Sequence, residues 1–414
     1  MTTRLQWILC FVVCFFMMSP IFLALNISGS VVLLALAVLT LTANRVRFSR
    51  AHTVTYILVV LFVISSCLSA FFNGVIEPIV FSLFFVLSVL TVLQTKDVNA
   101  RAMVGVASWI FAVFIVMAFV GVIYHLLGGE PLFTLANSDG RDNHFYLTTF
   151  SNAETFAIRP SAIYDEPGAF SFYICMLVIL RSRLGLSLKG SAALLLGGLI
   201  TQSIVHVMFA FLWFIWVLQH RDASVSTLRD NLLKRFYFAL FFVLSAFIVY
   251  QSGLLGWALE RAAYYYDNPW ANPRHNALNS IISAFAMNPG GVWFGFEKVC
   301  VQRLPGCSGM GENPLTPLIY GGLFSAWPYY LFLLVAIVAP LFSRDGLLLV
   351  GATLLLLQRP YFLEFPYSAL FALGFVVWFI PKVGMPRSRA FTLSPPKKGG
   401  ILYTLRKFDA VKKE

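Results

Sequence analysis

The sequence predicts an all-α polytopic membrane protein with about twelve transmembrane helices. Of its 414 residues, 59% are hydrophobic and only 12% are charged. That is too little charge to cover the surface of a soluble domain of this length. The apolar residues also come in runs of about 20, the length of helix that crosses about 30 Å of hydrocarbon. We therefore treat residues 1–414 as a single transmembrane domain surrounded by membrane lipids.

Polar or basic segments separate most of the apolar runs. The predicted spans are 5–25, 29–43, 53–72, 77–94, 102–126, 168–181, 236–254, 317–341, 346–358 and 366–381. The first run follows one arginine and could be mistaken for a signal peptide. Its apolar part exceeds the roughly 7–15 residues typical of such peptides, which favours a retained first helix.

The apolar stretch 190–218 needs separate treatment, because basic residues flank both of its ends. Lys189 precedes it and Arg221 follows it, and basic loops of membrane proteins stay in the cytoplasm. One helix cannot begin and end on the same side, so the stretch is predicted to form a hairpin that turns near 201–203. The alternative, one very long helix, would invert every later loop. The hairpin brings the count to twelve and places both termini in the cytoplasm.

Two large loops, 127–167 and 255–316, are predicted to face away from the cytoplasm, whereas 382–414 forms a basic cytoplasmic tail suited to anionic lipid. The net charge of +12 follows this topology, and no nucleic-acid-binding motif is present. Some basic residues are predicted to lie on the non-cytoplasmic side, although Lys and Arg normally favour cytoplasmic loops. They are either salt-bridge partners or functional groups. These residues are Arg141, Arg159, Arg261, Arg274, Lys298, Arg303 and Arg359.

The first loop ends in a polar segment, 159–170, directly before a predicted helix. Asp165 and Glu166 are followed by Pro167. Such a sequence suits a helix N-terminus, where proline fits the first turn and carboxylates match the dipole. The functional alternative places a carboxylate and Arg159 at the membrane surface, facing an anion carried by a lipid.

The second loop carries aromatic, glycine and charged residues in several clusters. Cys300 and Cys307 share this loop and are predicted to form a disulfide on an oxidising face. No histidine lies at ligand spacing from them, so no metal site is predicted. Further along the chain, Arg359 lies near the outer end of a short span, where an unpaired charge is costly. It either pairs with Glu364 or binds an anion inside the bundle.

Three features together resemble one family. Residues 159–170 look like an Arg…Tyr-x-Glu-Pro-x-x-Phe segment, 190–218 form a short hairpin, and 311–322 is similar to a Gly-x-Gly…His-Asn-x-x-Leu…Gly pattern. This combination resembles the Wzy-type O-antigen and capsule polymerases of the colanic-acid-like exopolysaccharide type, which share a superfamily with the O-antigen ligases. Ligase-like members carry histidine before asparagine, whereas this chain has Glu312 there. That departure disfavours a ligase.

The resemblance implies a GT-C-like fold in the bacterial inner membrane and a glycosyltransferase that needs no metal or other cofactor. Its substrates would be oligosaccharides linked to undecaprenyl pyrophosphate, joined on the periplasmic face. A chain-length regulator would be a further partner, and nucleic acid would not be one. The competing predictions are an O-antigen ligase and a lipid-linked glycan transporter or flippase, although transporters favour charged or broken helices at the midplane.

The resemblance also suggests roles for individual residues. Arginines would neutralise the departing pyrophosphate, since the planar guanidinium binds phosphate oxygens in pairs. The candidates are Arg159, Arg274 and Arg359. The base for the sugar hydroxyl would be Glu166 or Glu312, with His275 in reserve, although His275 is otherwise an ordinary loop histidine. The remaining substrate contacts are predicted at Tyr164, Arg261, Tyr265 and Asn313.

Overall fold

The computed structural model describes nine stretches and a few isolated positions of the chain. The stretches are 53–74, 76–94, 97–136, 142–151, 158–219, 281–286, 288–296, 314–342 and 346–358. The predicted spans 5–25, 29–43 and 366–381, and the basic tail 382–414, lie outside the described residues, and only isolated positions of the predicted span 236–254 are described.

The described part of the chain is mainly helical. Its helices are α4 (Thr53–Asn73), α5 (Glu77–Gln94), α6 (Asp97–Leu126), α7 (Pro167–Arg183), α8 (Leu188–Gly198), the 3-10 turn η2 (Leu199–Thr201), α9 (Ile204–Gln219), α13 (Gly291–Phe294), α15 (Thr316–Phe342) and α16 (Gly346–Gln358). These bounds confirm helices at the spans predicted within the described residues. Among them, Thr53–Asn73, Ala100–Leu126 and Gly321–Val338 are long and apolar enough to cross a bilayer, as in a membrane protein.

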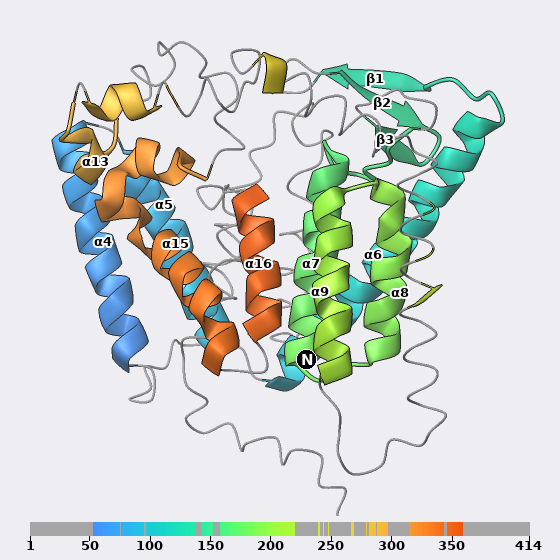
Figure 1. Cartoon of the computed structure of the whole chain (residues 1–414), viewed down its shortest axis with the longest axis horizontal. Helices are drawn as coiled ribbons and strands as arrows, with labels where there is room; N and C mark the ends of the chain where they lie inside the picture. Colours follow the sequence, from blue (N-terminus) through green and yellow to red (C-terminus); the bar gives the residue numbers. More distant parts are fainter. Residues whose placement is uncertain are drawn as a thin grey trace, which may run out of the picture.

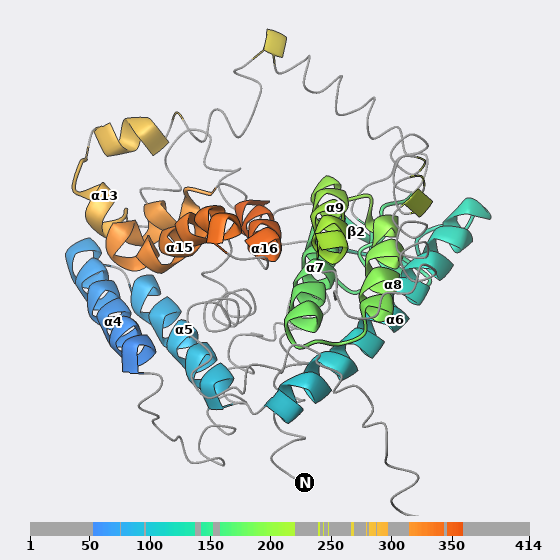
Figure 2. The ribbon, with the colours of Figure 1, turned by 60° about the horizontal axis from the view of Figure 1, so that its bottom comes forward.

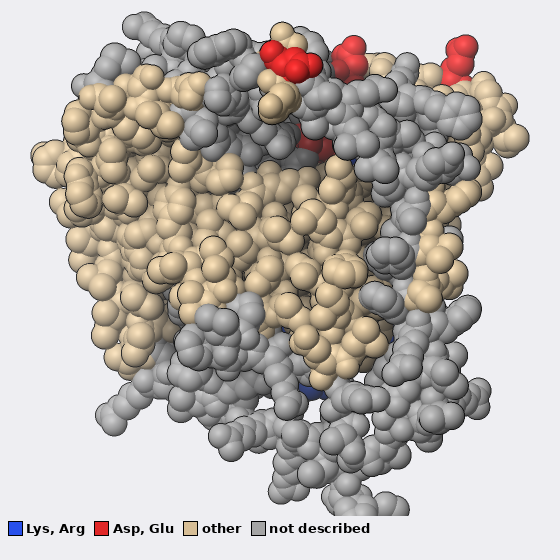
Figure 3. All heavy atoms as spheres, viewed as in Figure 1, with Lys and Arg blue, Asp and Glu red and all other residues tan. Residues whose placement is uncertain are grey.

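The long helices stand side by side in two groups. One group contains α4, α5 and α15, the other contains α6 to α9, and α16 joins them by packing on α15 and on α9 (Figures 1 and 2). Figure 3 shows a broad uncharged band between two ends of the molecule, with acidic side chains gathered at one end. We call that end, where β1–β3 and α13 also lie, the sheet end (Figure 1). An uncharged band of this kind matches the hydrocarbon layer of a membrane.

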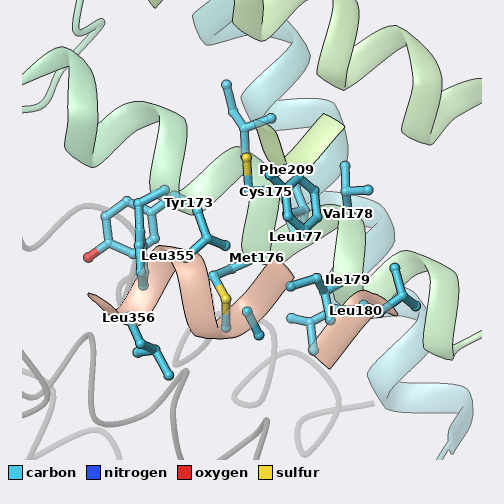
Figure 4. Packing of buried hydrophobic residues seen from close by; sticks show 14 of the residues in the cluster. Tyr173, Cys175, Met176, Leu177, Val178, Ile179, Leu180, Phe209, Leu355 and Leu356 are labelled. Carbon is cyan, nitrogen blue, oxygen red and sulfur yellow. The ribbon is translucent and has the colours of Figure 1, made fainter. Parts of the chain in front are cut away.

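Helix α7 is the centre of the larger core. Every residue from Pro167 to Arg181 is buried, as expected for a helix that is apolar on all sides and has neighbours all round. Helices α6, α8, α9 and α16 supply those neighbours. Figure 4 shows this packing, with Met176 of α7, Phe209 of α9 and Leu355 of α16 in one cluster.

The first loop contains a three-stranded antiparallel sheet that the all-α prediction did not include. Its strands are β1 (Phe133–Ala136), β2 (Asp142–Tyr146) and β3 (Thr149–Ser151), in the order β1-β2-β3. Phe145 pairs in register with Phe133 and with Phe150, at ring-centroid distances of 4.7 Å and 4.8 Å. Such cross-strand aromatic pairs stabilise a sheet, but strands of three to five residues leave almost no periodic signal in a sequence.

The sheet is attached to the C-terminal half of α6. The hydroxyl of Thr148, in the β2–β3 turn, donates a hydrogen bond to the backbone oxygen of Met117 at 2.6 Å. Gly121 lies beneath Thr149 so closely that a Cβ at residue 121 would overlap the threonine side chain. The sheet therefore has a defined position against the C-terminal half of α6.

Helix α15 is broken near its start, at Gly322, whose φ of 60° and ψ of −173° are not helical. The backbone of Trp293, in α13, occupies the space where a Cβ of residue 322 would lie. The hydroxyl of Ser69 on α4 is 2.8 Å from the backbone oxygens of both Phe294 and Gly321. At this break, Trp293 and Phe294 of the predicted second loop therefore contact both α4 and α15.

At the end of α7 opposite the sheet, Arg181 connects three helices. It is only 8% exposed. Its guanidinium donates hydrogen bonds to the hydroxyls of Ser108 on α6 and Ser191 on α8, at 2.7 Å and 3.0 Å. A third bond, of 3.0 Å, goes to the backbone oxygen of Ser187. Because all three partners are neutral, the charge is stabilised by hydrogen bonds and by its place in the last turn of α7, where cations match the dipole.

We expect Arg181→Ala to destabilise the protein by about 2–4 kcal/mol, because the two serine hydroxyls and the Ser187 carbonyl would lose their charged donor. The measurement is the thermal unfolding midpoint of the purified protein in detergent. Lys189→Ala is the matched control, since Lys189 is an exposed cation nearby, and it should change stability by no more than about 0.5 kcal/mol. Equal midpoints for the two variants would contradict the role assigned to Arg181.

Candidate functional site

The predicted hairpin is confirmed, and its turn forms one wall of the candidate site. Helix α8 ends at Gly198, η2 covers Leu199–Thr201, and α9 begins at Ile204. Gln202 reverses the chain in a left-handed conformation, with a φ of 53°. The turn lies at the sheet end of the bundle (Figure 1).

His206 fastens the hairpin to α7 just below the turn. It is fully buried, and its Nε2 lies 2.9 Å from the backbone oxygen of Leu195 on α8. Because a carbonyl can only accept, Nε2 carries the proton. The Nδ1 atom then accepts from the hydroxyl of Ser171 on α7, at 3.2 Å. Gly198 leaves room for the ring, since a Cβ there would overlap it.

The second wall is the segment 158–166, which strand β3 holds in place. Phe150 exchanges backbone hydrogen bonds with this segment: its N–H donates to Ala162 and its oxygen accepts from Ser161, both at 2.8 Å. The Ala162 N–H donates to the hydroxyl of Thr149, also at 2.8 Å. The small sheet therefore positions the residues that were predicted to be functional.

Arg159 crosses from this segment to the turn of the hairpin. Its Nη2 lies 3.5 Å from the backbone oxygen of Gln202, and its buried Nε has no hydrogen-bond partner among the described residues. Burial lowers the pKa of Arg159, and the nearby negative charge of Glu166 partly offsets that shift. Arg159 thus remains charged, and its Nε–H is still available to donate a hydrogen bond to another group.

Glu166 immediately precedes α7, as the sequence predicted for this helix start. It occupies the N-cap position, and Pro167 begins the helix. The side chain makes no capping hydrogen bond and is only 7% exposed. A carboxylate at this position is stabilised by the α7 dipole and by Arg159. Glu166 can therefore both stabilise the start of α7 and act as a functional carboxylate beside Arg159.

Tyr164 lies between Arg159 and Glu166 in the sequence and packs against α7. Its ring is fully buried and stacks on Tyr173 and Phe170 of α7, with centroid distances of 5.1 Å and 5.8 Å. Burial raises the pKa of Tyr164 well above its ordinary value, so the phenol stays neutral. Its hydroxyl is buried and has no hydrogen-bond partner among the described residues.

The site therefore combines a half-buried arginine, a buried carboxylate near it and several polar atoms at the sheet end of an apolar bundle. Ala162 and Gln202 lie on its two walls, each with a φ of 53°. Side chains other than glycine rarely adopt this conformation, which costs of order 1–3 kcal/mol and clusters at functional sites. Such an arrangement can bind an anion through Arg159 and accept a proton on Glu166.

Of the predicted site residues, the structure brings together Arg159, Tyr164 and Glu166. The others lie outside the described residues and stay predictions: Arg261, Tyr265, Arg274, His275, Cys300, Cys307, Glu312, Asn313 and Arg359. Gln202 and Ser203 enter the site although no role was assigned to them. The predicted turn could have indicated them, because it brings the start of α9 to the same end as 159–166.

Metal ligation was not predicted, and among the described residues no group of three or more His, Cys, Asp or Glu side chains could hold a metal ion. Figure 3 shows acidic atoms inside a recess at the sheet end, on the same end as Glu166. The charged groups of the site thus lie at the margin of the apolar band rather than within it.

Comparison of the chain with protein-family models, with curated proteins and with solved structures found no match.

Proposed function

We propose that the protein is a polysaccharide polymerase of the bacterial inner membrane, with about twelve spans and both termini in the cytoplasm. It would join oligosaccharide repeat units carried on undecaprenyl pyrophosphate at the periplasmic face. The observation that carries the proposal is the half-buried Arg159, whose buried Nε–H has no hydrogen-bond partner among the described residues and which lies near Glu166. The resemblance of 159–170 to a polymerase segment supports it.

The position of this pair suits a substrate whose anion is attached to a lipid. The apolar helix α7 begins at Pro167, directly after Glu166. Arg159 is therefore held where the apolar band ends and polar groups begin. A lipid-linked pyrophosphate lies at this level of a membrane, with its hydrocarbon chain below and its sugars above.

The proposed reaction is a single glycosyl transfer. A hydroxyl of the acceptor sugar forms a bond to the anomeric carbon of the donor, and the bond between that carbon and the pyrophosphate oxygen breaks. The pyrophosphate leaves with the electron pair, and arginines stabilise its charge. Arg159 would do so with Arg274 and Arg359. The hydroxyl proton passes to a carboxylate, Glu166 or Glu312, or alternatively to His275.

The broken helix α15 could suggest a transporter, but its geometry favours a different use. In transporters, broken helices form sites near the midplane. Here the break at Gly322 lies at the start of the apolar segment Gly321–Val338, and the backbone of Trp293 and Phe294 fills it. The break therefore accommodates a segment of the second loop rather than an ion.

The glycan profile of cells that lack the protein separates the candidate functions. Loss of a polymerase should leave single repeat units on the lipid carrier or its final acceptor. Loss of an O-antigen ligase would instead leave long polymer on the carrier, and loss of a flippase would leave undecorated cells with repeats trapped inside. Either of the latter profiles would contradict the proposal. Restoration of polymer by the intact gene is the control.

A further inference from the structure

The start of α9, beside Arg159, has hydrogen-bond donors without a partner. Ser203 directly precedes the helix and is 4% exposed, and its hydroxyl has no hydrogen-bond partner among the described residues. The first N–H groups of any α-helix have no acceptor within the helix. A buried hydroxyl without a partner costs about 1–3 kcal/mol, so a ligand that accepts from it would recover that cost.

Two sources of positive charge meet at this point. The guanidinium of Arg159 lies against the turn through its contact with the Gln202 oxygen, and the N-terminus of α9 carries about half a positive charge. The first turn of α9 contains no acidic residue. Helix α7 differs, because Asp165 and Glu166 immediately precede it. Of the two helices that begin at this site, α7 has carboxylates at its start and α9 has none.

We infer that the turn of the α8–α9 hairpin binds a phosphate group, through the Ser203 hydroxyl and the free N–H groups at the start of α9, with Arg159 on the opposite side. A phosphate has enough acceptor oxygens to receive a hydroxyl, backbone N–H groups and a guanidinium at once. The inference deepens the proposed function and rests on it for one point, that the phosphate belongs to the pyrophosphate of a lipid carrier.

Ser203→Asp is the sharpest test, because it introduces a negative charge directly before the start of α9. Aspartate caps a helix start as well as serine does, yet its carboxylate would repel the phosphate. Ser187→Asp is the matched control, since Ser187 is the exposed N-cap residue of α8 at the other end of the hairpin. Ser203→Ala removes only the hydroxyl and serves if the aspartate variant does not fold.

Binding should be measured by calorimetry on the purified full chain, with inorganic pyrophosphate and with undecaprenyl pyrophosphate in nanodiscs. We expect the unmodified protein and Ser187→Asp to bind alike. Ser203→Asp should bind at least about tenfold more weakly and Ser203→Ala several-fold more weakly. If the Ser203 variants bind both probes more weakly, the site recognises the phosphate itself. If they bind only the lipid form more weakly, the site recognises the headgroup of the lipid carrier. Either result supports the inference.

Unchanged binding in Ser203→Asp, or no binding of either probe by the unmodified protein, would overturn the inference. The proposed function can fail separately. If Ser203→Asp loses binding but the unmodified protein never elongates a lipid-linked glycan, the phosphate site stands and the polymerase assignment falls. If the protein elongates glycan and Ser203→Asp binds and elongates normally, the polymerase stands and the role of the hairpin turn falls.

Discussion

Arg159→Ala is expected to abolish long-chain polymer while the amount of protein in the membrane stays normal. The substitution removes the half-buried guanidinium that would stabilise the departing pyrophosphate. Loss of one preorganised donor to a developing charge slows a reaction by about 100-fold or more. Because Arg159 makes only one hydrogen bond with described residues, of 3.5 Å to Gln202, its removal should affect folding less than it affects activity. Gel profiles of the cell-surface glycan, with a quantitative blot, provide the measurement.

Arg159→Lys is the informative companion to this variant. Lysine retains a positive charge but lacks the planar fork that binds two phosphate oxygens. We expect shortened polymer rather than none, with a rate between those of Arg159→Ala and the unmodified protein. Chain lengths equal to those of the unmodified protein in Arg159→Ala would remove this residue from the site.

Gly322→Ala is expected to have the largest effect on stability. Its backbone conformation, at a φ of 60° and a ψ of −173°, belongs to a region that is essentially reserved for glycine. A Cβ there would also overlap the backbone of Trp293, which a rotamer change cannot relieve. We expect a loss of more than about 3 kcal/mol, or failure to accumulate. The thermal midpoint of the purified protein in detergent measures it.

Gly105→Ala provides the control for this prediction. Gly105 lies within α6, and a Cβ there would meet no atom within 4 Å. Alanine at an ordinary helical position should be neutral or should stabilise by up to about 1 kcal/mol. If Gly322→Ala were as stable as Gly105→Ala, the second loop segment could not be seated against the break in α15.

The long helices of the described region could be predicted closely from the sequence, because they are apolar runs bounded by polar residues. The span predicted at 53–72 corresponds to Thr53–Asn73, and the span at 346–358 to Gly346–Gln358. The hairpin was predictable for a different reason. Basic residues at both of its ends require the chain to return to the side from which it came.

The sheet and the break in α15 could not be predicted in the same way. Strand β3 has only three residues, too few to show a periodic pattern in the sequence, and it is held by pairing with β2 and with the segment at Ser161 and Ala162. The break depends on contact between Gly322 and Trp293, which is a property of tertiary packing. In the site, Arg159 and Glu166 were predictable from their motif, whereas Ser203 became a candidate only when the structure placed it near Arg159.

The most direct test of the central claim is an elongation assay with the purified protein in detergent, without ion gradients. The assay supplies a defined oligosaccharide repeat unit linked to undecaprenyl pyrophosphate, and it separates products by length. The account predicts a ladder of products that differ by one repeat unit, together with released undecaprenyl pyrophosphate, and neither product from Arg159→Ala. If correctly folded protein left all of the substrate unmodified, that result would contradict the account.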